Sequence, residues 1–187
     1  MRPRLFIISG PSGSGKGTIV AELLKRHPDI YFSISATTRA PREGLEKDGV
    51  NYYFITREKF EDMIAHNEFI EYAGYCGNYY GTPRKPVEDA LKNGRSVILE
   101  IETKGMRNAL AQYPDAVTVF ITPPSMEILA ERLRGRKSEN EEKLRLRLAQ
   151  AEEEMKLKDT YRHCVVNDDL AGAWEAMDRI YLEETAD

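Results

Sequence analysis

Largely apolar runs recur along this chain and alternate with segments whose apolar residues have helical spacing. The candidate strands are 5–9, 96–101, 116–121 and 164–166. Such uninterrupted runs are typical of strands buried on both faces of a parallel sheet. Apolar residues have helical spacing from Ile19 until Pro28, which ends a predicted helix, and again around 106–110. Strands that alternate with helices predict an α/β fold with right-handed crossovers.

Two stretches interrupt this alternation. The segment 33–82 is rich in Tyr, Thr, Gly and Asn and has aromatic runs at 51–56 and 69–75, a pattern that predicts a small mixed β lobe. Residues 132–147 are almost wholly charged, so this segment is either a solvated helical hairpin or a mobile basic lid. We therefore expect one domain, 1–187, with two lobes inserted into its core. The expected core is 1–32, 83–125 and 160–187, with the β lobe at 33–82 and the lid at 126–159.

Composition argues against several classes of function. The 187 residues include 27 Lys and Arg against 31 Asp and Glu, a net charge of -4, so no overall basic field would draw the chain onto nucleic acid or a membrane surface. Cys76 and Cys164 form neither a disulfide framework nor a zinc-binding pattern and are expected to be ordinary thiols. The N-terminal apolar run is too short for a signal peptide or a membrane span, and we expect a cytoplasmic protein. The sequence does not distinguish a monomer from a homodimer.

A glycine-rich loop follows the first candidate strand and precedes the first candidate helix. Its residues are Gly10, Pro11, Ser12, Gly13, Ser14, Gly15, Lys16, Gly17 and Thr18. Glycines let successive backbone N–H groups converge on phosphate oxygens, Lys16 can reach the outer phosphates, and the helix N-terminus adds partial positive charge. This context predicts phosphate binding on a P-loop NTPase-type parallel sheet, and the loop residues are the candidate ATP-binding residues of the chain.

The end of the loop narrows the class further. The usual motif has Ser or Thr directly after the lysine, where its hydroxyl contacts Mg²⁺, but this chain has Gly17 there. Thr18 is one residue later, rotated by about 100° on a helix, so a bound metal would keep more of its waters. The Gly-Lys-Gly-Thr ending resembles that of adenylate kinases, which favours a nucleoside-monophosphate kinase over a GTPase.

Several longer motifs follow in a fixed order. They are Ser-Ala-Thr-Thr-Arg-Ala-Pro-Arg at 35–42, Gly-Asn-Tyr-Tyr-Gly-Thr at 77–82, Glu-Ile-Glu at 100–102, Arg-Leu-Arg-Gly-Arg at 132–136 and Val-Asn-Asp-Asp at 166–169. With the glycine loop they span nearly the whole chain, which closely resembles guanylate kinases. The resemblance implies transfer of the γ-phosphoryl group of ATP to GMP, and to dGMP, forming ADP and GDP, with Mg²⁺ as the cofactor of ATP.

The resemblance also assigns roles to residues. The GMP-binding positions of the family correspond to Ser35, Arg39, Arg42, Tyr52, Glu71, Tyr80, Thr82 and Glu102. Planar guanidinium groups suit phosphate, and a carboxylate such as Glu71 suits the N1–H and amino donors of guanine. The catalytic cations that the family implies are Lys16, Arg39, Arg132, Arg136 and Arg147, and Asn167 matches a position near the adenine. Glu100, at a strand end, is expected to order waters of the metal, and Arg145 has no assigned role.

One departure and two rival functions remain open. The family's usual acid at position 102 is Asp, so Glu102 puts the geometry of guanine recognition in question. A catalytically silent kinase-like scaffold would need neither Lys16 nor the lid arginines, and their presence favours an enzyme. A related P-loop kinase with another acceptor is opposed by Glu71 and by the 77–82 motif.

Overall fold

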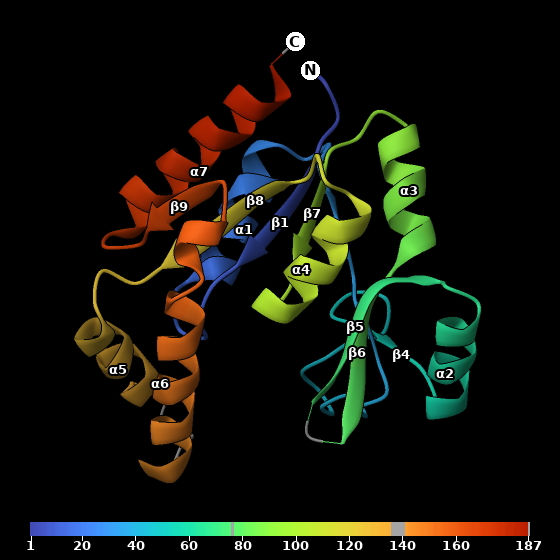
Figure 1. Cartoon of the computed structure of the whole chain (residues 1–187), viewed down its shortest axis with the longest axis horizontal. Helices are drawn as coiled ribbons and strands as arrows, with labels where there is room; N and C mark the ends of the chain where they lie inside the picture. Colours follow the sequence, from blue (N-terminus) through green and yellow to red (C-terminus); the bar gives the residue numbers. More distant parts are fainter. Residues whose placement is uncertain (76, 136–140, 187) are drawn as a thin grey trace.

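The computed structural model describes residues 1–75, 77–135 and 141–186, which form two sheets (Figure 1). The larger sheet is parallel throughout, and its strands, in spatial order, are β2 (Tyr31–Phe32), β7 (Val97–Glu100), β1 (Leu5–Ser9), β8 (Val117–Thr122) and β9 (His163–Val166). The smaller sheet is mixed, with the order β4 (Tyr53–Phe54), β3 (Ala36–Thr37), β6 (Asn78–Pro83) and β5 (Phe69–Tyr75). The predicted α/β class, with a parallel core and an inserted mixed lobe, is confirmed.

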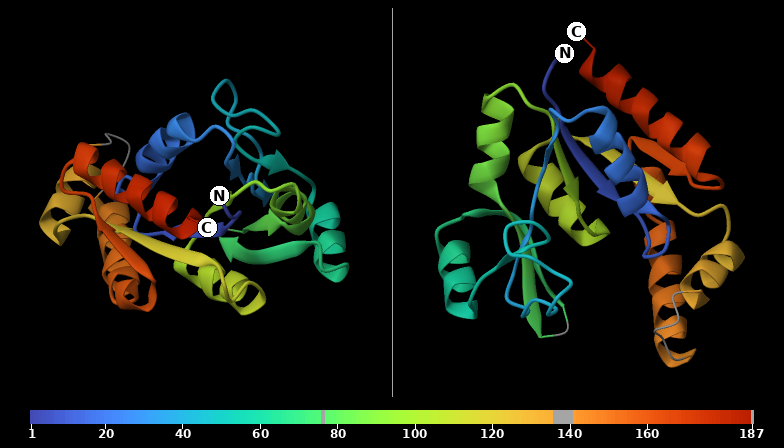
Figure 2. Two further views of the ribbon diagram at one scale, coloured as in Figure 1. Left: turned by 90° about the horizontal axis from the view of Figure 1, so that it is seen from above. Right: turned by 180° about the vertical axis from the view of Figure 1, so that it is seen from behind.

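Helices cover both faces of the parallel sheet (Figure 2). Phe6 and Ile8 of β1 share one buried cluster with residues of α1 (Lys16–Arg26) and α7 (Leu170–Thr185). Leu5 and Ile7 point the other way, into a cluster with α3 (Arg84–Lys92) and α4 (Thr103–Gln112). Because side chains alternate between the two covered faces, every position of β1 is buried.

The mixed sheet has a small core of its own. Phe60, on α2 (Arg57–Ala65), is fully buried and stacks on Phe69 and Tyr79 with ring centroids 4.3 and 5.2 Å apart. The Thr56 side chain caps this helix by accepting a hydrogen bond from the Lys59 backbone N–H. This packing fixes β5 and β6, whose polar side chains face the site described below.

A pair of helices forms the third part of the molecule. They are α5 (Met126–Arg134) and α6 (Glu141–Met155), joined by the buried side chains of Leu129, Leu133, Leu144 and Ala151. A short 3-10 helix, η1 (Lys158–Thr160), leads from α6 toward β9. The α5–α6 pair and the mixed sheet project from the same end of the parallel sheet, the end where its strands finish (Figure 1). The carboxyl ends of parallel strands are where α/β proteins place their ligands.

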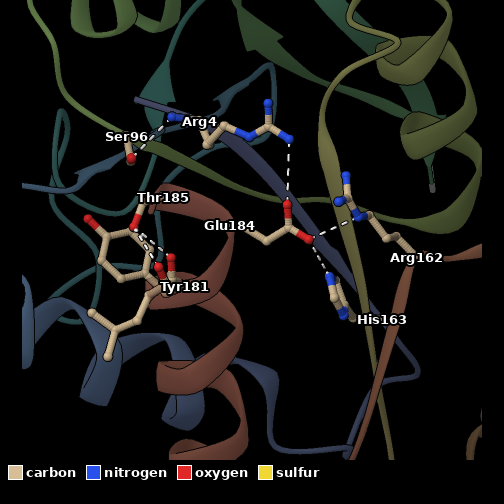
Figure 3. A network of polar contacts seen from close by, with 8 residues as sticks. Arg4, Ser96, Arg162, His163, Tyr181, Glu184 and Thr185 are labelled. Carbon is tan, nitrogen blue, oxygen red and sulfur yellow. Dashed lines mark hydrogen bonds and ion pairs between the residues drawn. The ribbon is translucent and has the colours of Figure 1, made fainter. Parts of the chain in front are cut away.

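A buried carboxylate binds three basic side chains at the end of the core where β1 and β9 begin (Figure 3). Glu184 of α7, whose side chain is 8% exposed, lies 3.5 Å from Arg4, 2.9 Å from Arg162 and 2.7 Å from His163. These residues precede β1 and border β9, so the contacts tie the last helix to the central and edge strands. No helix in the described parts of the chain is long and apolar enough to cross a membrane.

Candidate nucleotide site

The glycine loop joins β1 to α1 and is closely enclosed. A Cβ on Gly10, where φ is +145°, would lie 2.0 Å from the Ile121 carbonyl oxygen of β8. A Cβ on Gly15, where φ is +91°, would lie 2.2 Å from Nδ2 of Asn167. Glycine is needed at both positions because of the left-handed backbone and because the neighbouring atoms leave no room. The loop is therefore held in one shape.

Lys16 begins α1 and lies against this loop. Its Nζ donates hydrogen bonds to the carbonyl oxygens of Gly10, at 2.6 Å, and Pro11, at 3.3 Å. The α1 N-terminus adds backbone N–H groups and the positive end of the helix dipole. Glu100 ends β7; burial raises the pKa of its carboxyl, and the charge of Lys16 opposes that shift. A lysine beside a helix N-terminus is an arrangement that suits a bound anion.

Asn167 is hydrogen-bonded to the glycine loop. Its buried side-chain Nδ2 donates a 2.7 Å hydrogen bond to the Ser14 carbonyl oxygen, and its backbone N–H donates to Thr122 of β8. Arg132 of α5 donates from Nη2 to the Asn167 carbonyl oxygen at 3.0 Å. The structure thus brings two predicted ATP-binding residues, Ser14 and Asn167, together with Arg132, a predicted catalytic residue.

The remaining lid residues are less closely grouped. Arg147 lies on α6 and is half-buried, and exposed Arg145 borders a hollow with Arg134 between the two helices. Arg136 lies outside the described residues.

The mixed sheet and the start of α4 enclose a cavity of about 310 Å³. Six of its lining residues carry predicted roles: Ser35, Tyr52, Glu71, Tyr80, Glu100 and Glu102. Parallel pairing of β3 with β4 places Ser35 beside Tyr52, and the Tyr52 and Tyr80 rings meet edge to face, with centroids 6.1 Å apart. Five of the eight predicted GMP-binding residues therefore come from several segments to one concave surface, and Arg39, Arg42 and Thr82 are not among its lining residues.

Glu71 is the buried carboxylate of this cavity. It pairs with Thr82 across β5 and β6, and the Thr82 hydroxyl donates a 2.6 Å hydrogen bond to its Oε1. Burial raises the pKa of the Glu71 carboxyl, the Thr82 hydrogen bond opposes this, and nearby Glu102 raises the pKa further. A Cβ on Gly105 of α4 would lie 2.5 Å from Oε2, so the absence of a side chain there gives this oxygen its space.

Glu102 differs from Glu71 in its surroundings. It is exposed, precedes α4 as its N-cap residue, and makes no side-chain capping hydrogen bond. It lines the same cavity as Glu71. The two acids therefore have unequal desolvation costs and unequal freedom to move.

The Arg39 guanidinium lies beside the tyrosines, with its central carbon 5.5 Å from the Tyr52 ring centroid. Its main partner is Glu46, which the sequence interpretation did not single out. Arg42 is exposed, and its backbone N–H donates to the same carboxylate at 2.8 Å. The only sequence signal for Glu46 is an acid close to two arginines, and Glu43 has the same property.

Among the described residues, no group of three His, Cys, Asp or Glu side chains is arranged to hold a metal ion. Gly17 is exposed, and a Cβ there would meet no atom within 4 Å, so lack of space does not explain why this position has no hydroxyl group. Glu100, which the sequence had assigned to metal waters, is close enough to Lys16 for the lysine charge to lower the pKa of its carboxyl.

The loop, its lysine and the adjoining pocket define a P-loop nucleotide-binding protein. The family model described as guanylate kinase matches residues 2–184. A guanylate kinase of Carboxydothermus hydrogenoformans is 52% identical over 180 residues, covering 96% of this chain and 88% of that protein. One of Gloeobacter violaceus is 50% identical over 184 residues, covering 98% and 89%. The chain belongs to the guanylate kinase family.

A solved structure agrees with this placement. The crystal structure of guanylate kinase from Anaplasma phagocytophilum superposes with a TM-score of 0.78 at 33% identity, covering 99% of this chain and 87% of that one. Family membership explains why residues of the 35–42, 77–82 and 100–102 motifs meet around one cavity.

Proposed function

We propose that this protein transfers the γ-phosphoryl group of ATP to GMP or dGMP, releasing ADP and GDP or dGDP. The observation that carries the proposal is Glu71, a buried carboxylate in a cavity at the same end of the sheet as the lysine-bearing loop. Guanine N1–H and its amino group are both donors, which an acceptor-only carboxylate satisfies. Adenine has an acceptor at N1 and would leave the buried carboxylate unpaired.

The acceptor half of the site holds the monophosphate. Arg39 and Arg42 supply cationic donors, and Tyr52 and Tyr80, which line the cavity, supply hydroxyl groups for the same phosphate. Ser35 and Thr82 complete the contacts with the base. The GMP phosphate is already an anionic nucleophile near neutral pH, so no general base is required.

The donor half neutralises charge on the triphosphate. Lys16 and the loop N–H groups bind the β- and γ-phosphates, and Arg132, Arg136 and Arg147 approach the transferring group from the lid. Asn167 keeps the loop in its binding shape by holding the Ser14 carbonyl oxygen. Catalysis then consists of positioning two anions and stabilising their charge.

Magnesium fits this arrangement as a cofactor that arrives with ATP. Bound there, Mg²⁺ would help to neutralise the phosphates. Phosphate oxygens and water molecules would supply most of its ligands. Gly17 offers no hydroxyl, so Glu100 would act on the metal through water.

The three parts of the chain suggest how water is kept out. We assign 33–82 as the GMP-binding lobe, 126–159 as the lid and the rest as the core, and both insertions close over the nucleotides. Closure excludes water from the transfer. Small-angle X-ray scattering with a bisubstrate analogue should give a smaller radius of gyration, and an unchanged radius at saturation would contradict closure.

The function itself is tested by a coupled assay of ADP release over GMP, AMP, UMP and CMP. GMP should be phosphorylated far faster than the other three. Equal rates with several acceptors would favour another P-loop kinase, and no turnover with intact nucleotide binding would favour a silent scaffold.

A further inference from the structure

We propose that Glu46 is a positioning residue for the acceptor phosphate: it fixes the Arg39 guanidinium so that a second pair of N–H donors faces the phosphate. The inference rests on the proposed function, because it concerns how the same site binds GMP. Its basis is the hydrogen bonding of one arginine in a loop that the family motifs only partly cover.

The bonds of Arg39 to Glu46 and Ala40 leave the Nε edge of its guanidinium to the Tyr80 hydroxyl and to a ligand. Nη1 donates to Oε2 of Glu46 at 2.9 Å and to the Ala40 carbonyl oxygen at 2.8 Å, and Nη2 donates to Oε1 of Glu46 at 2.8 Å. These bonds use the end of the planar group. Nε–H and the second N–H of Nη2 share the other edge and are engaged by neither Glu46 nor Ala40. Two parallel donors on one edge suit a phosphate.

The neighbours of that guanidinium are themselves predicted phosphate ligands. The Tyr80 hydroxyl interacts with Arg39, and the Tyr52 ring lies 5.5 Å from its central carbon. Since both tyrosines line the acceptor cavity, Arg39 is held at the margin of that cavity. A guanidinium fixed there loses less conformational entropy when GMP binds.

Glu46 is itself held in place. Its Oε2 accepts a second hydrogen bond from the Arg42 backbone N–H at 2.8 Å, and its side chain is only 12% exposed. The Glu46 backbone N–H donates to the Arg42 carbonyl oxygen, which closes a turn between them. The Arg39 hydrogen bonds and the Arg42 N–H lower the Glu46 pKa to about 2, so the carboxylate stays charged near neutral pH.

The same contacts allow an opposite reading, in which Glu46 occupies the place of the phosphate and competes with GMP. The hydrogen bonds favour positioning, because a competitor must leave and would break its bonds to both arginines. The two readings differ in sign: loss of the carboxylate weakens GMP binding under positioning and strengthens it under competition.

Isothermal titration calorimetry with GMP, guanosine and ATP tests the inference on wild type, Glu46→Gln and Glu46→Ala. GMP should bind both variants roughly tenfold or more weakly. Guanosine, which lacks the phosphate, and ATP should bind as in wild type. Glu43→Ala, an exposed acid of the same loop, is the matched control and should leave all three affinities unchanged.

The other outcomes are decisive too. Tighter or unchanged GMP binding in both variants would overturn the inference, and so would an equal loss for guanosine, which would mean that the loop had lost its structure. Glu46→Gln keeps the size of the side chain, so it remains informative if Glu46→Ala does not fold. If wild-type protein does not bind GMP, the proposed function fails instead, and the two failures are distinguishable.

Discussion

The Thr82 hydroxyl donates a 2.6 Å hydrogen bond to Oε1 of Glu71 across the antiparallel pair β5 and β6. Both side chains are buried, and the bond holds one carboxylate oxygen while Oε2 faces the side chain-free position of Gly105. The ionised carboxylate is thus kept in an environment that disfavours charge. Guanine would relieve that cost by donating to it.

Replacing the buried acid should remove base discrimination. Glu71→Gln keeps the shape but brings an NH₂ group toward the guanine donors, so the preference for GMP over AMP in kcat/KM should fall by about 100-fold or more. Glu102→Asp, at the exposed acid, should keep the preference and change the GMP KM by less than about tenfold. Steady-state kinetics with both acceptors measures this, with the exposed Glu68→Gln as control. Full selectivity in Glu71→Gln with lost selectivity in Glu102→Asp would reverse the two roles.

The raised Glu71 pKa predicts a pH dependence of GMP affinity. Protonation replaces an acceptor with a donor, so GMP affinity should fall as pH decreases through a pKa above the usual value for Glu. The stability effect has the opposite sign: a raised folded pKa stabilises the fold below the unfolded pKa, and this is lost as pH rises through the folded pKa. GMP titrations from about pH 8 to about pH 5 should therefore converge for wild type and Glu71→Gln at the acidic end. A constant ratio of their affinities would refute the assignment.

Lys16 should matter for transfer and not for the acceptor. Lys16→Ala removes the ammonium that lies over the loop, so kcat should fall by about 100-fold or more while the Kd for GMP stays near its wild-type value. Lys25→Ala, at an exposed lysine of the same helix, is the control. Single-turnover rates measure the effect on transfer, and GMP calorimetry measures the effect on acceptor binding. Wild-type turnover in Lys16→Ala would contradict the catalytic role of Lys16 and favour the scaffold hypothesis.

Asn167 should act on ATP through the loop. Asn167→Ala removes the 2.7 Å bond to the Ser14 carbonyl oxygen, so the ATP KM should rise by about tenfold with the GMP KM unchanged. Asp168→Ala alters the exposed neighbour and should change neither KM. If both KM values rise together in Asn167→Ala, the residue supports the fold as a whole and not the loop.

The Glu184 cluster should govern stability alone. Glu184→Ala leaves Arg4 and His163 without their shared partner, and Arg4 is largely buried, so the free energy of unfolding should fall by about 2–4 kcal/mol. Glu183→Ala, its exposed neighbour, should have little effect. Urea denaturation measures the difference. Specific activity per folded molecule should stay unchanged, since Arg4 and His163 lie where β1 and β9 begin, at the end of the parallel sheet opposite to the glycine loop.

Much of the fold could be predicted because its signals are local. The continuous apolar run at β1 implies a strand covered on both faces, and α1 and α7 do cover one of them. The glycine loop could also be predicted, since all of its phosphate-binding groups belong to consecutive residues. The acceptor site does not: Glu71 and Thr82 became interpretable only through the resemblance to a family.

Other site residues depend on long-range geometry. The Asn167 side chain meets Ser14 across 153 positions, and no sequence pattern links them. Glu46 and Glu43 are equivalent by composition, and only the turn that closes on the Arg42 carbonyl oxygen selects Glu46. Gly105 becomes important only because Glu71 packs against it.

Transfer of ³²P from γ-labelled ATP to GMP tests the central claim most directly. The purified chain, mixed with both nucleotides and Mg²⁺, should give label that migrates with GDP on chromatography, and Lys16→Ala and Glu71→Gln should give far less. Substituting AMP for GMP should give little labelled product. Label released as inorganic phosphate, or equal labelling of AMP and GMP by the wild-type protein, would contradict the account.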